Sequence, residues 1–299
     1  MDILDQLIQL AQIRGQADIH CRLQGDWSIP HEQKQGQANM HIISRGSGWL
    51  NIAGEKEARA IKQGDILFFP QAHTHRLSSS DKSLHRQEKI HSRKQGVFTL
   101  NYCGDYAQAD MEFFCAVFHY EANAALFRAL PQMIAINVEH PALQTLSRLL
   151  KNEADKYDEG AASLIHALSS ALFIMIIRAY LADSPALPEG IIKAGREPRL
   201  QPLIHAIMHN PEQDWTIEKL CELGHLSRAQ LMRLFRQHLN ISPYAFILQT
   251  RLQKAAHLLK NSQDSILNIA LLSGFNSETN FGKAFKNYYG ISAGDYRKQ

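Results

Sequence analysis

The spacing of hydrophobic and polar positions changes once along the chain. From about Gln16 to Tyr120, short apolar or alternating runs such as "MHIISRGSGWLNIAG" and "GDILFFP" are separated by Gly, Pro and Asp, which is typical of strands in a compact barrel or sandwich. From Pro141 the period becomes helical, and "ASLIHALSSALFIMIIRAYLA" is apolar on nearly every side. We therefore expect this helix to be buried, either in the domain core or at a subunit interface.

A segment rich in Pro and Gly, residues 183–198, follows these helices and is the natural linker. The remaining residues, 199–299, have helical patterns throughout. At 299 residues the chain is long enough for two domains of ordinary size. We therefore expect an α+β chain with a β-rich domain over residues 1–182, including a helical extension at about 141–182, and an all-α domain over residues 199–299.

Two stretches of the C-terminal third repeat one arrangement: "GHLSRAQLMRLFRQHLN" and "GFNSETNFGKAFKNYYG". On a helical wheel each puts its large apolar residues in one sector and its basic residues in the opposite one. The stretches align at an offset of fifty, with Ser227 and Ser277 as N-caps and with Arg233 and Lys283 on the outer faces. Each follows a short apolar helix and a tight turn. This pattern predicts two helix-turn-helix units, whose second helices enter the major groove of DNA.

The residues between the two units, from Pro243 onward, predict one continuous helix of about eighteen residues, or roughly 27 Å at ~1.5 Å per residue. One turn of duplex DNA is ~34 Å long. Two reading helices joined by such a spacer can occupy successive major grooves on one face of double-stranded DNA. One chain already supplies both helices, so DNA binding does not require a dimer.

Charge and composition agree with a nucleic-acid partner. Residues 200–299 carry 11 Lys and Arg against 7 Asp and Glu, whereas the rest of the chain carries 21 against 22, so all the net charge of +3 comes from the last third. The sequence has no N-terminal signal pattern, and its most apolar run, "ALFIMII", is far below the ~20 residues of a membrane span. We expect a cytoplasmic protein with no membrane partner.

The last hundred residues resemble the DNA-binding domain of the AraC/XylS family of bacterial transcription regulators, nearly without gaps from Trp215 to Lys298. The elements that carry the resemblance are Arg251, Ile269-Ala270, Gly274-Phe275, Phe281, Ala284-Phe285-Lys286, Gly290 and Tyr296-Arg297. Two positions depart from the family pattern: Cys221 stands where Ala is usual, and Ala293 stands where Pro is usual. The resemblance implies a transcription regulator, more often an activator that contacts RNA polymerase than a repressor.

The resemblance also implies which residues contact DNA. The base-reading positions fall on Ala229, Met232 and Arg233 in the first unit and on Glu278, Thr279, Asn280 and Lys283 in the second. Arg236 and Lys286 align on the same outer faces and complete the expected set, with Lys286 as a phosphate contact. Arginine pairs with guanine and asparagine with adenine. Glu278 would repel phosphates, so it either accepts from a cytosine amino group or points away from DNA.

The N-terminal part resembles the cupin sensor domains that precede such DNA-binding domains, which implies a cupin-like β-barrel. "GDILFFPQAHTH" fits the second cupin motif through Gly64, Pro70 and His75, and His41 fits the first histidine of the first motif. Further support comes from Gly46, Cys103-Gly104 and Leu130-Pro131. Ala72 and Ser79 depart from the second motif, Ile43 takes the place of a histidine in the first, and no glutamate follows.

Only two of the four usual cupin metal ligands, His41 and His75, are therefore present, whereas a catalytic metal normally keeps three protein ligands. We expect this pair to be packed or to face a small-molecule effector, with a metal ion as the weaker alternative. His73 could join His75 if both side chains pointed the same way. The only cofactor candidates from the sequence are therefore this metal ion and a small-molecule effector in the cupin pocket.

Two cysteines are candidates for redox sensing. Cys21 lies between His20 and Arg22, and Cys103 precedes a glycine. A thiol beside cationic groups has a lowered pKa and reacts faster with oxidants. We hypothesise that Cys21 and Cys103 form an oxidant-responsive switch, the alternative being that both are small hydrophobic residues. Cys115 and Cys221 are expected to be packing residues.

The sequence thus favours a DNA-binding transcription regulator controlled by an effector or by cysteine oxidation in the N-terminal domain, and not an enzyme. One rival is a cupin oxygenase or isomerase fused to a DNA-binding domain, which the incomplete ligand set disfavours. Another is a regulator that senses a metabolite and has no redox role. If the protein forms a homodimer, residues 141–181 are the expected place of self-association.

Overall fold

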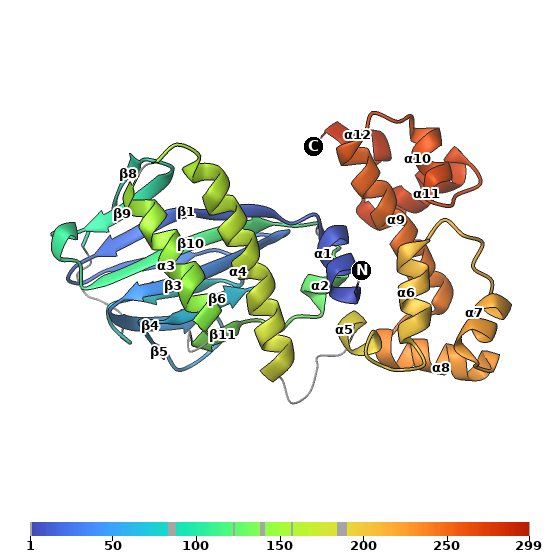
Figure 1. The fold of residues 1–299 in the computed structure, drawn as a ribbon, viewed down its shortest axis with the longest axis horizontal. Coiled ribbons are helices and arrows are strands. Elements are labelled where there is room, and N and C mark those ends of the chain that lie inside the picture. The colour runs from blue at the N-terminus through green and yellow to red at the C-terminus, as the bar shows by residue number, and fades with distance from the viewer. Residues whose placement is uncertain are drawn as a thin grey trace. The chain divides into compact units, whose positions relative to one another are not determined.

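The computed structural model describes residues 2–82, 88–121, 123–137, 141–156, 158–183 and 190–298. The described chain forms two compact units (Figure 1). The β unit contains the described parts of residues 13–121 and 130–183, and the helical unit contains residues 2–12, 123–129 and 190–298. The α+β class predicted from the sequence is confirmed.

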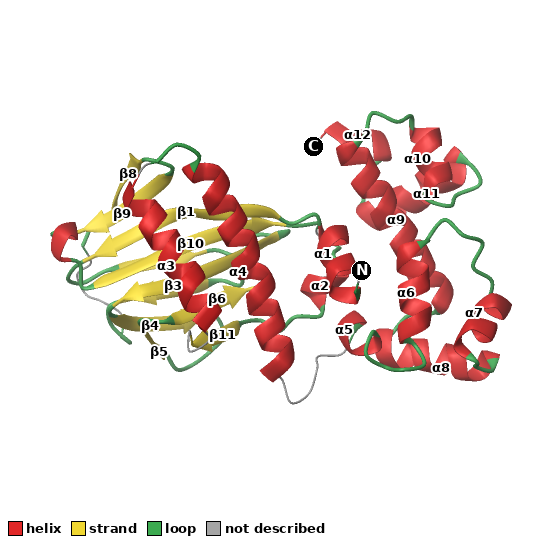
Figure 2. Ribbon diagram, in the orientation of Figure 1, coloured by secondary structure: helices red, strands yellow, loops and turns green. Residues whose placement is uncertain are grey.

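The β unit is built on two sheets (Figure 2). The first has seven strands in the order β11-β6-β3-β10-β1-β9-β8, and the second has four in the order β2-β7-β4-β5. Only β1 and β9 pair in parallel among the described strands, so the larger sheet is mixed. The strands are β1 (Arg14–Leu23), β2 (Ser28–His31), β3 (Gln37–Arg45), β4 (Ser47–Ile52), β5 (Arg59–Lys62), β6 (Asp65–Phe69), β7 (His75–Ser78), β8 (His91–Gln95), β9 (Phe98–Cys103), β10 (Met111–His119) and β11 (Ile134–Asn137).

The two sheets do not close into the barrel that the sequence suggested. In the described residues no strand pair joins one sheet to the other, so β11, β8, β2 and β5 remain edges. The chain changes sheets at Gly46, between β3 and β4, where φ is +83°. A Cβ atom at this position would overlap the carbonyl oxygen of Asp110, so the sharp passage requires glycine. The β unit is therefore a two-layer sandwich.

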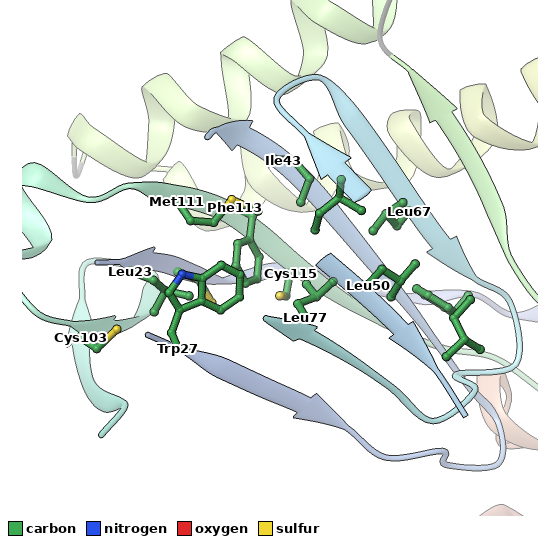
Figure 3. Close-up of a cluster of buried hydrophobic side chains, with 14 residues drawn as sticks. Leu23, Trp27, Ile43, Leu50, Leu67, Leu77, Cys103, Met111, Phe113 and Cys115 are labelled. Carbon is green, nitrogen blue, oxygen red and sulfur yellow. The ribbon is translucent and has the colours of Figure 1, made fainter. Parts of the chain in front are cut away.

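The space between the sheets is filled by a buried hydrophobic cluster (Figure 3). Trp27 packs against Phe113, with their ring centroids 6.1 Å apart. Successive residues of a strand point to opposite faces. On β1, Cys21 therefore points into the cluster, while His20 points to the other face of the large sheet. Cys103 and Cys115 belong to the same cluster as Cys21.

Helices α3 (Pro141–Lys156) and α4 (Ala161–Asp183) cover the outer face of the seven-stranded sheet (Figure 1). Phe173 of α4 lies 5.6 Å from the rings of both Phe68 and Phe118. Ser169 accepts a hydrogen bond from the backbone N–H of Ala17 at 2.9 Å. By length and composition α4 could cross a membrane, but its buried side packs on the sheet as a core helix does. The predicted helical extension is confirmed.

The helical unit takes in more of the chain than the residues after the expected linker. Its elements are α1 (Ile3–Ala11), α2 (Ala125–Arg128), α5 (Ile191–Ala194), α6 (Gln201–His209), α7 (Ile217–Gly224), α8 (Arg228–Leu239), α9 (Pro243–Asn261), α10 (Ile266–Leu272), α11 (Glu278–Tyr289) and α12 (Ala293–Lys298). Helix α1 packs against α2, α6 and α9, and Gln253 of α9 donates to the carbonyl of Asn123 at 3.3 Å. Residues 2–12 and 123–129 thus fold with the C-terminal helices, although the sequence suggested one N-terminal domain over 1–182.

The expected linker over residues 183–198 is only partly described. Residues 184–189 lie outside the described residues, and the part that follows contains the short helix α5. The backbone N–H of Gly190 donates to the carbonyl of His238 at 3.1 Å. Residues 190–198 are therefore an ordered part of the helical unit.

Candidate functional site

The predicted helix-turn-helix units are formed by α7 with α8 and by α10 with α11. Ser227 caps α8, with Gln230 returning the hydrogen bond, and Ser277 caps α11 by accepting from the backbone N–H of Asn280 at 3.2 Å. The turns are similar, because each contains a residue with a left-handed backbone conformation, His225 in the first unit and Gly274 in the second, although the second turn is one residue longer from this residue to the N-cap. The repeat therefore extends from the sequence to the backbone of each unit.

The inner faces of the two second helices are buried and the outer faces are exposed. Phe235 of α8 and the matching Phe285 of α11 are both 0% exposed. All the residues predicted to contact DNA are exposed: Ala229, Met232, Arg233 and Arg236 on α8, and Glu278, Thr279, Asn280, Lys283 and Lys286 on α11. Cys221 and Ala270 occupy matching positions, and each accepts a backbone hydrogen bond across its turn at 2.9 Å.

The outer faces of α8 and α11 carry exposed basic residues. Arg233 and Arg236 on α8, and Lys283 and Lys286 on α11, form no ion pair with any acidic residue that the structure describes. Glu278 is the only acidic residue on α11. These cations are free to attract a polyanion.

One continuous helix, α9, joins the two units. It has 19 residues, which gives roughly 28 Å at ~1.5 Å per residue. Arg251, at its middle, donates to the carbonyls of Pro211 and Gln213 at 2.8 Å each. Gly274 approaches the guanidinium so closely that a Cβ there would touch it. Arg251 therefore fastens the spacer to the segment before α7 and to the turn of the second unit.

A cluster of three histidines lies between the two sheets of the β unit. His41 comes from β3, His75 from β7 and His31 from β2, and their candidate ligand atoms all lie within 4.8 Å of one another. His41 Nε2 lies 2.7 Å from His75 Nε2, and His41 Nδ1 lies 3.1 Å from Cys115 Sγ. The sequence identified His41 and His75 but missed His31, which belongs to neither cupin motif. The pairing of β2 with β7 places His31 opposite His75.

His73 does not join this cluster as the sequence allowed. It precedes β7, so strand alternation does not apply to it, and its carbonyl accepts a hydrogen bond from His75 Nδ1 at 2.5 Å. The hydrogen bonds are satisfied together if Cys115 donates to His41 Nδ1 and His41 Nε2–H donates to His75 Nε2. Cys115 is thus a partner of a histidine and more than a packing residue.

The three imidazoles are neutral near pH 7. Burial, followed by repulsion from His75, lowers the pKa of His31 to about 3. Burial lowers the pKa of His75 to about 4, although its hydrogen bond to the carbonyl of His73 acts in the opposite direction. The pKa of His41 is also lowered well below its usual value by burial and by the other two histidines. Each ring therefore keeps one nitrogen lone pair for hydrogen bonding or ligation.

The cysteines predicted to sense oxidants are buried. Cys21 and Cys103 are each 1% exposed, and burial raises the pKa of the Cys103 thiol. His20 does not lie beside the thiol of Cys21, because alternation along β1 sends its side chain to the opposite face of the sheet. Activation by neighbouring cations is therefore not supported by the geometry. Hydrogen bonding to Cys21, together with burial, raises the pKa of Cys115 well above its usual value.

The opposite face of β1 carries a buried ion-pair network that the sequence did not suggest. His20 Nε2 and Lys151 Nζ each lie 2.8 Å from a carboxylate oxygen of Glu112. Burial alone would raise the pKa of Glu112, but these two hydrogen bonds outweigh it and lower the pKa to about 2. The network joins β1, β10 and α3. Its residues lie far apart in the sequence, so no local sequence pattern could have identified the network.

A cavity of about 590 Å³ lies beside this network, between the large sheet and α3. Its wall includes Ile43, Arg148 and Lys151, and the hydroxyl of Ser147 is buried there without a hydrogen-bond partner among the described residues. The predicted effector-facing pair, His41 and His75, does not line this cavity. The cavity and the histidine cluster are therefore separate features of the β unit.

Comparison with known proteins gives matches over the whole chain. Residues 2–182 match the family described as "Cupin", and residues 220–299 match "Helix-turn-helix domain". The HTH-type transcriptional regulator MtrA of Neisseria gonorrhoeae is 44% identical over 303 residues, covering 100% of this chain and 99% of that protein. An HTH-type transcriptional regulator of Haemophilus influenzae is 40% identical, with the same coverage of each chain. The RCS-specific HTH-type transcriptional activator RclR of Escherichia coli is 26% identical, covering 100% and 98%.

Proposed function

The chain belongs to the AraC/XylS family of DNA-binding transcription regulators with an N-terminal cupin domain, and we propose that it activates transcription by gripping two successive major grooves. One observation carries this proposal: α8 and α11 present matched and exposed basic faces, without ion pairs in the described part of the chain, at the two ends of one continuous helix. Binding by both units doubles the number of base and phosphate contacts that one chain makes.

Within each groove the residues have different roles. Arg233 suits bidentate pairing with guanine, and Asn280 suits pairing with adenine. Lys286 and Arg236 suit phosphate oxygens, which position the helix without reading sequence. Met232 and Ala229 offer apolar contact to a thymine methyl group. The two units differ at these positions, so we propose that they read different half-sites and give the operator a direction.

Activation requires a contact with RNA polymerase, and the support for it is that the relative from E. coli is named an activator. We place the protein in the cytoplasm, where the nucleoid and the polymerase are. Self-association is a further proposal and rests on Leu149 of α3 and Leu164 of α4, which are 43% and 47% exposed. The contacts to DNA do not depend on it.

We propose that the cupin domain senses a signal and does not catalyse a reaction. Helix α1 precedes β1 by two residues, and β10 precedes α2, while β1 and β10 are paired from Arg14 and His119 onward. Both helices fold with the DNA-binding helices. A change in the two strands is therefore passed along the covalent chain to α1 and α2, where it alters the packing of the helical unit.

The signal is either a small-molecule effector or oxidation. Oxidation is favoured by the presence of Cys21, Cys103 and Cys115 in one core cluster. The contact between Cys21 and Cys115 makes this pair, and not Cys21 with Cys103, the more direct route to a disulfide. Burial slows both, so a transient opening of the sandwich would have to precede the reaction. Cys21→Ser tests this signal. If the thiols are only core residues, the change in transcription caused by an oxidant stays the same in this variant.

The test is selection of duplexes from a random pool by the full chain, followed by transcription in vitro from the selected site. We expect a site with two unlike half-sites about one helical turn apart and transcription that increases with the protein present. The same assay with oxidants, metal salts and candidate metabolites identifies the signal. Selection of a single half-site, or of no sequence, would contradict the proposal.

A further inference from the structure

We propose that His31, His41 and His75 bind one divalent transition-metal ion, with Zn²⁺ as the type, between the two sheets of the β unit. The ligands come from three strands, two in the small sheet and one in the large sheet. Their nitrogen atoms already lie within 4.8 Å of one another. The inference concerns the β unit alone and stands whether or not the proposed mode of DNA binding is right.

His31 supplies the strongest reason to expect an ion here. Its Nε2 atom is buried and has no hydrogen-bond partner among the described residues. A buried polar atom without a partner has lost its hydrogen bonds to water, so such atoms are rare and need an explanation. His31 stacks on His75, with ring centroids 4.8 Å apart. A metal ion shared with the neighbouring rings gives this nitrogen its partner.

The other two rings are oriented as metal ligands usually are. A ligating histidine normally donates its second ring N–H to a carbonyl or a similar acceptor, which fixes the ring and the tautomer. His75 does so through Nδ1, which donates to the carbonyl of His73, and its Nε2 lone pair faces the other rings. His41 needs only to move its proton from Nε2 to Nδ1, where Cys115 Sγ lies 3.1 Å away as the acceptor.

The distances require small side-chain movements. Zn–N bonds of ~2.0–2.1 Å place the nitrogens of a tetrahedral site about 3.3 Å apart. His41 Nε2 and His75 Nε2, now 2.7 Å apart, must separate slightly, and the longer separations within the cluster must shorten. His31 lies on β2, which pairs with one neighbour only among the described strands, so this strand can adjust more easily than a central one.

The donor set decides the class of ion. Three imidazoles suit Zn²⁺, Co²⁺, Ni²⁺, Cu²⁺ or Fe²⁺, whereas Ca²⁺ and Mg²⁺ prefer oxygen ligands. Ile43 stands where a cupin motif has its second histidine, and His31 supplies the third nitrogen from outside both motifs. Three protein ligands leave a fourth position open for water or a small effector. The ion would also tie the two sheets together.

The experiment is a titration of the full chain, freed of metal by a chelator, with Co²⁺ followed by visible absorption, and then displacement by Zn²⁺. We expect one equivalent of Co²⁺ with the absorption of a tetrahedral site, and a rise in Tm on adding Zn²⁺. His31→Ala should weaken binding by about tenfold or more, while circular dichroism stays unchanged because His31 is on an edge strand.

A matched control is His205→Ala with His209→Ala, which removes the stacked histidine pair on α6, a possible adventitious metal site. This variant should bind as the wild type does. His75→Ala should abolish binding, and if it fails to fold, His31→Ala decides the question alone. Binding of Co²⁺ that survives His31→Ala, that is lost in the α6 variant, or that is absent from the wild type overturns the proposal.

Discussion

The helical unit and the β unit place their chemistry differently. In the helical unit the candidate residues lie on exposed outer faces, their scaffold is a repeated local pattern, and Phe235 and Phe285 anchor the two copies at matching positions. In the β unit the candidate residues are buried between sheets and come from strands far apart in sequence, such as β2 and β7. The surface residues can therefore change with little effect on folding, whereas changes in the interior affect folding and sensing together.

The largest expected effect comes from breaking the scaffold under the reading helix. Phe285→Ala should destabilise the helical unit by about 3–5 kcal/mol, because the ring is fully buried and packs on Phe281 and Tyr296. Urea unfolding followed by circular dichroism measures the change. Lys286→Ala, one residue further on and exposed, should alter stability by less than about 0.5 kcal/mol. Equal losses of stability in Phe285→Ala and Lys286→Ala would contradict the distinction between a buried anchor residue and an exposed DNA-contacting residue.

The next effect concerns the interior of the β unit. Glu112 has a pKa of about 2 in the folded protein against about 4.5 in the unfolded chain, so its ion pairs stabilise the fold above pH 4.5, and this stabilisation is lost as the pH falls from 4.5 toward 2. Glu112→Gln should cost about 2–3 kcal/mol at pH 7. The difference in the free energy of unfolding between this variant and the wild type should become smaller below pH 4.5.

The control for this prediction is Glu55→Gln, because Glu55 pairs with the half-exposed Arg59 at the surface. Its effect should stay below about 1 kcal/mol at any pH. Thermal unfolding of both variants across pH 2–7 gives the comparison. If the difference in stability between Glu112→Gln and the wild type is constant over this range, the ion pairs of Glu112 do not cause the pH dependence of stability.

A smaller effect is expected from a base-reading residue. Arg233→Ala should weaken binding to the selected duplex by about 1–3 kcal/mol and relax the preference at one base step. Folding should not change, since the side chain is exposed and unpaired in the described structure. Binding to single-base variants of the site, measured at fixed salt, reports both effects. An unaltered base preference would remove Arg233 from the reading set.

The smallest effect belongs to a phosphate contact. Lys286→Ala should weaken all duplexes alike and reduce the slope of log K against log salt by about 1, because one fewer counterion is released. Affinities for specific and random duplexes at several salt concentrations give the slope. If the slope is unchanged, Lys286 does not touch the backbone.

The difference between the units also explains what the sequence could predict. Helix period, serine caps and the fifty-residue repeat are local signals, so both helix-turn-helix units, the continuous α9 and the exposure of Arg233 or Lys283 followed from the sequence. The histidine cluster is not local: His31 reaches His75 only through the pairing of β2 with β7. His20 and Cys21 are a different case: strand alternation, itself a local rule, sends the side chains of these consecutive residues to opposite faces of the sheet, so adjacency in sequence does not bring the imidazole to the thiol.

The packing of residues 2–12 and 123–129 was the other feature beyond local reasoning, although the cupin family match ends at residue 182, where the predicted first domain ends. Helix α1 and the segment around α2 lie in the N-terminal half of the sequence, yet α1 packs on α6 and α9, and α2 packs on α1 and α5. These partners lie far away in the sequence, and a pattern of hydrophobic positions does not identify its partner. The barrel expected from the cupin motifs likewise became a two-layer sandwich, because closure depends on pairing between edge strands.

The central claim is that one chain binds two successive major grooves of a DNA duplex at the same time. Hydroxyl-radical footprinting of the full chain on the selected duplex tests it directly, with a second duplex that carries five extra base pairs, about half a helical turn, between the half-sites. We predict two protected tracts about one turn apart on one face, and loss of one tract on the lengthened duplex. Two tracts of unchanged strength on both duplexes, or a single tract on the selected one, would contradict the account.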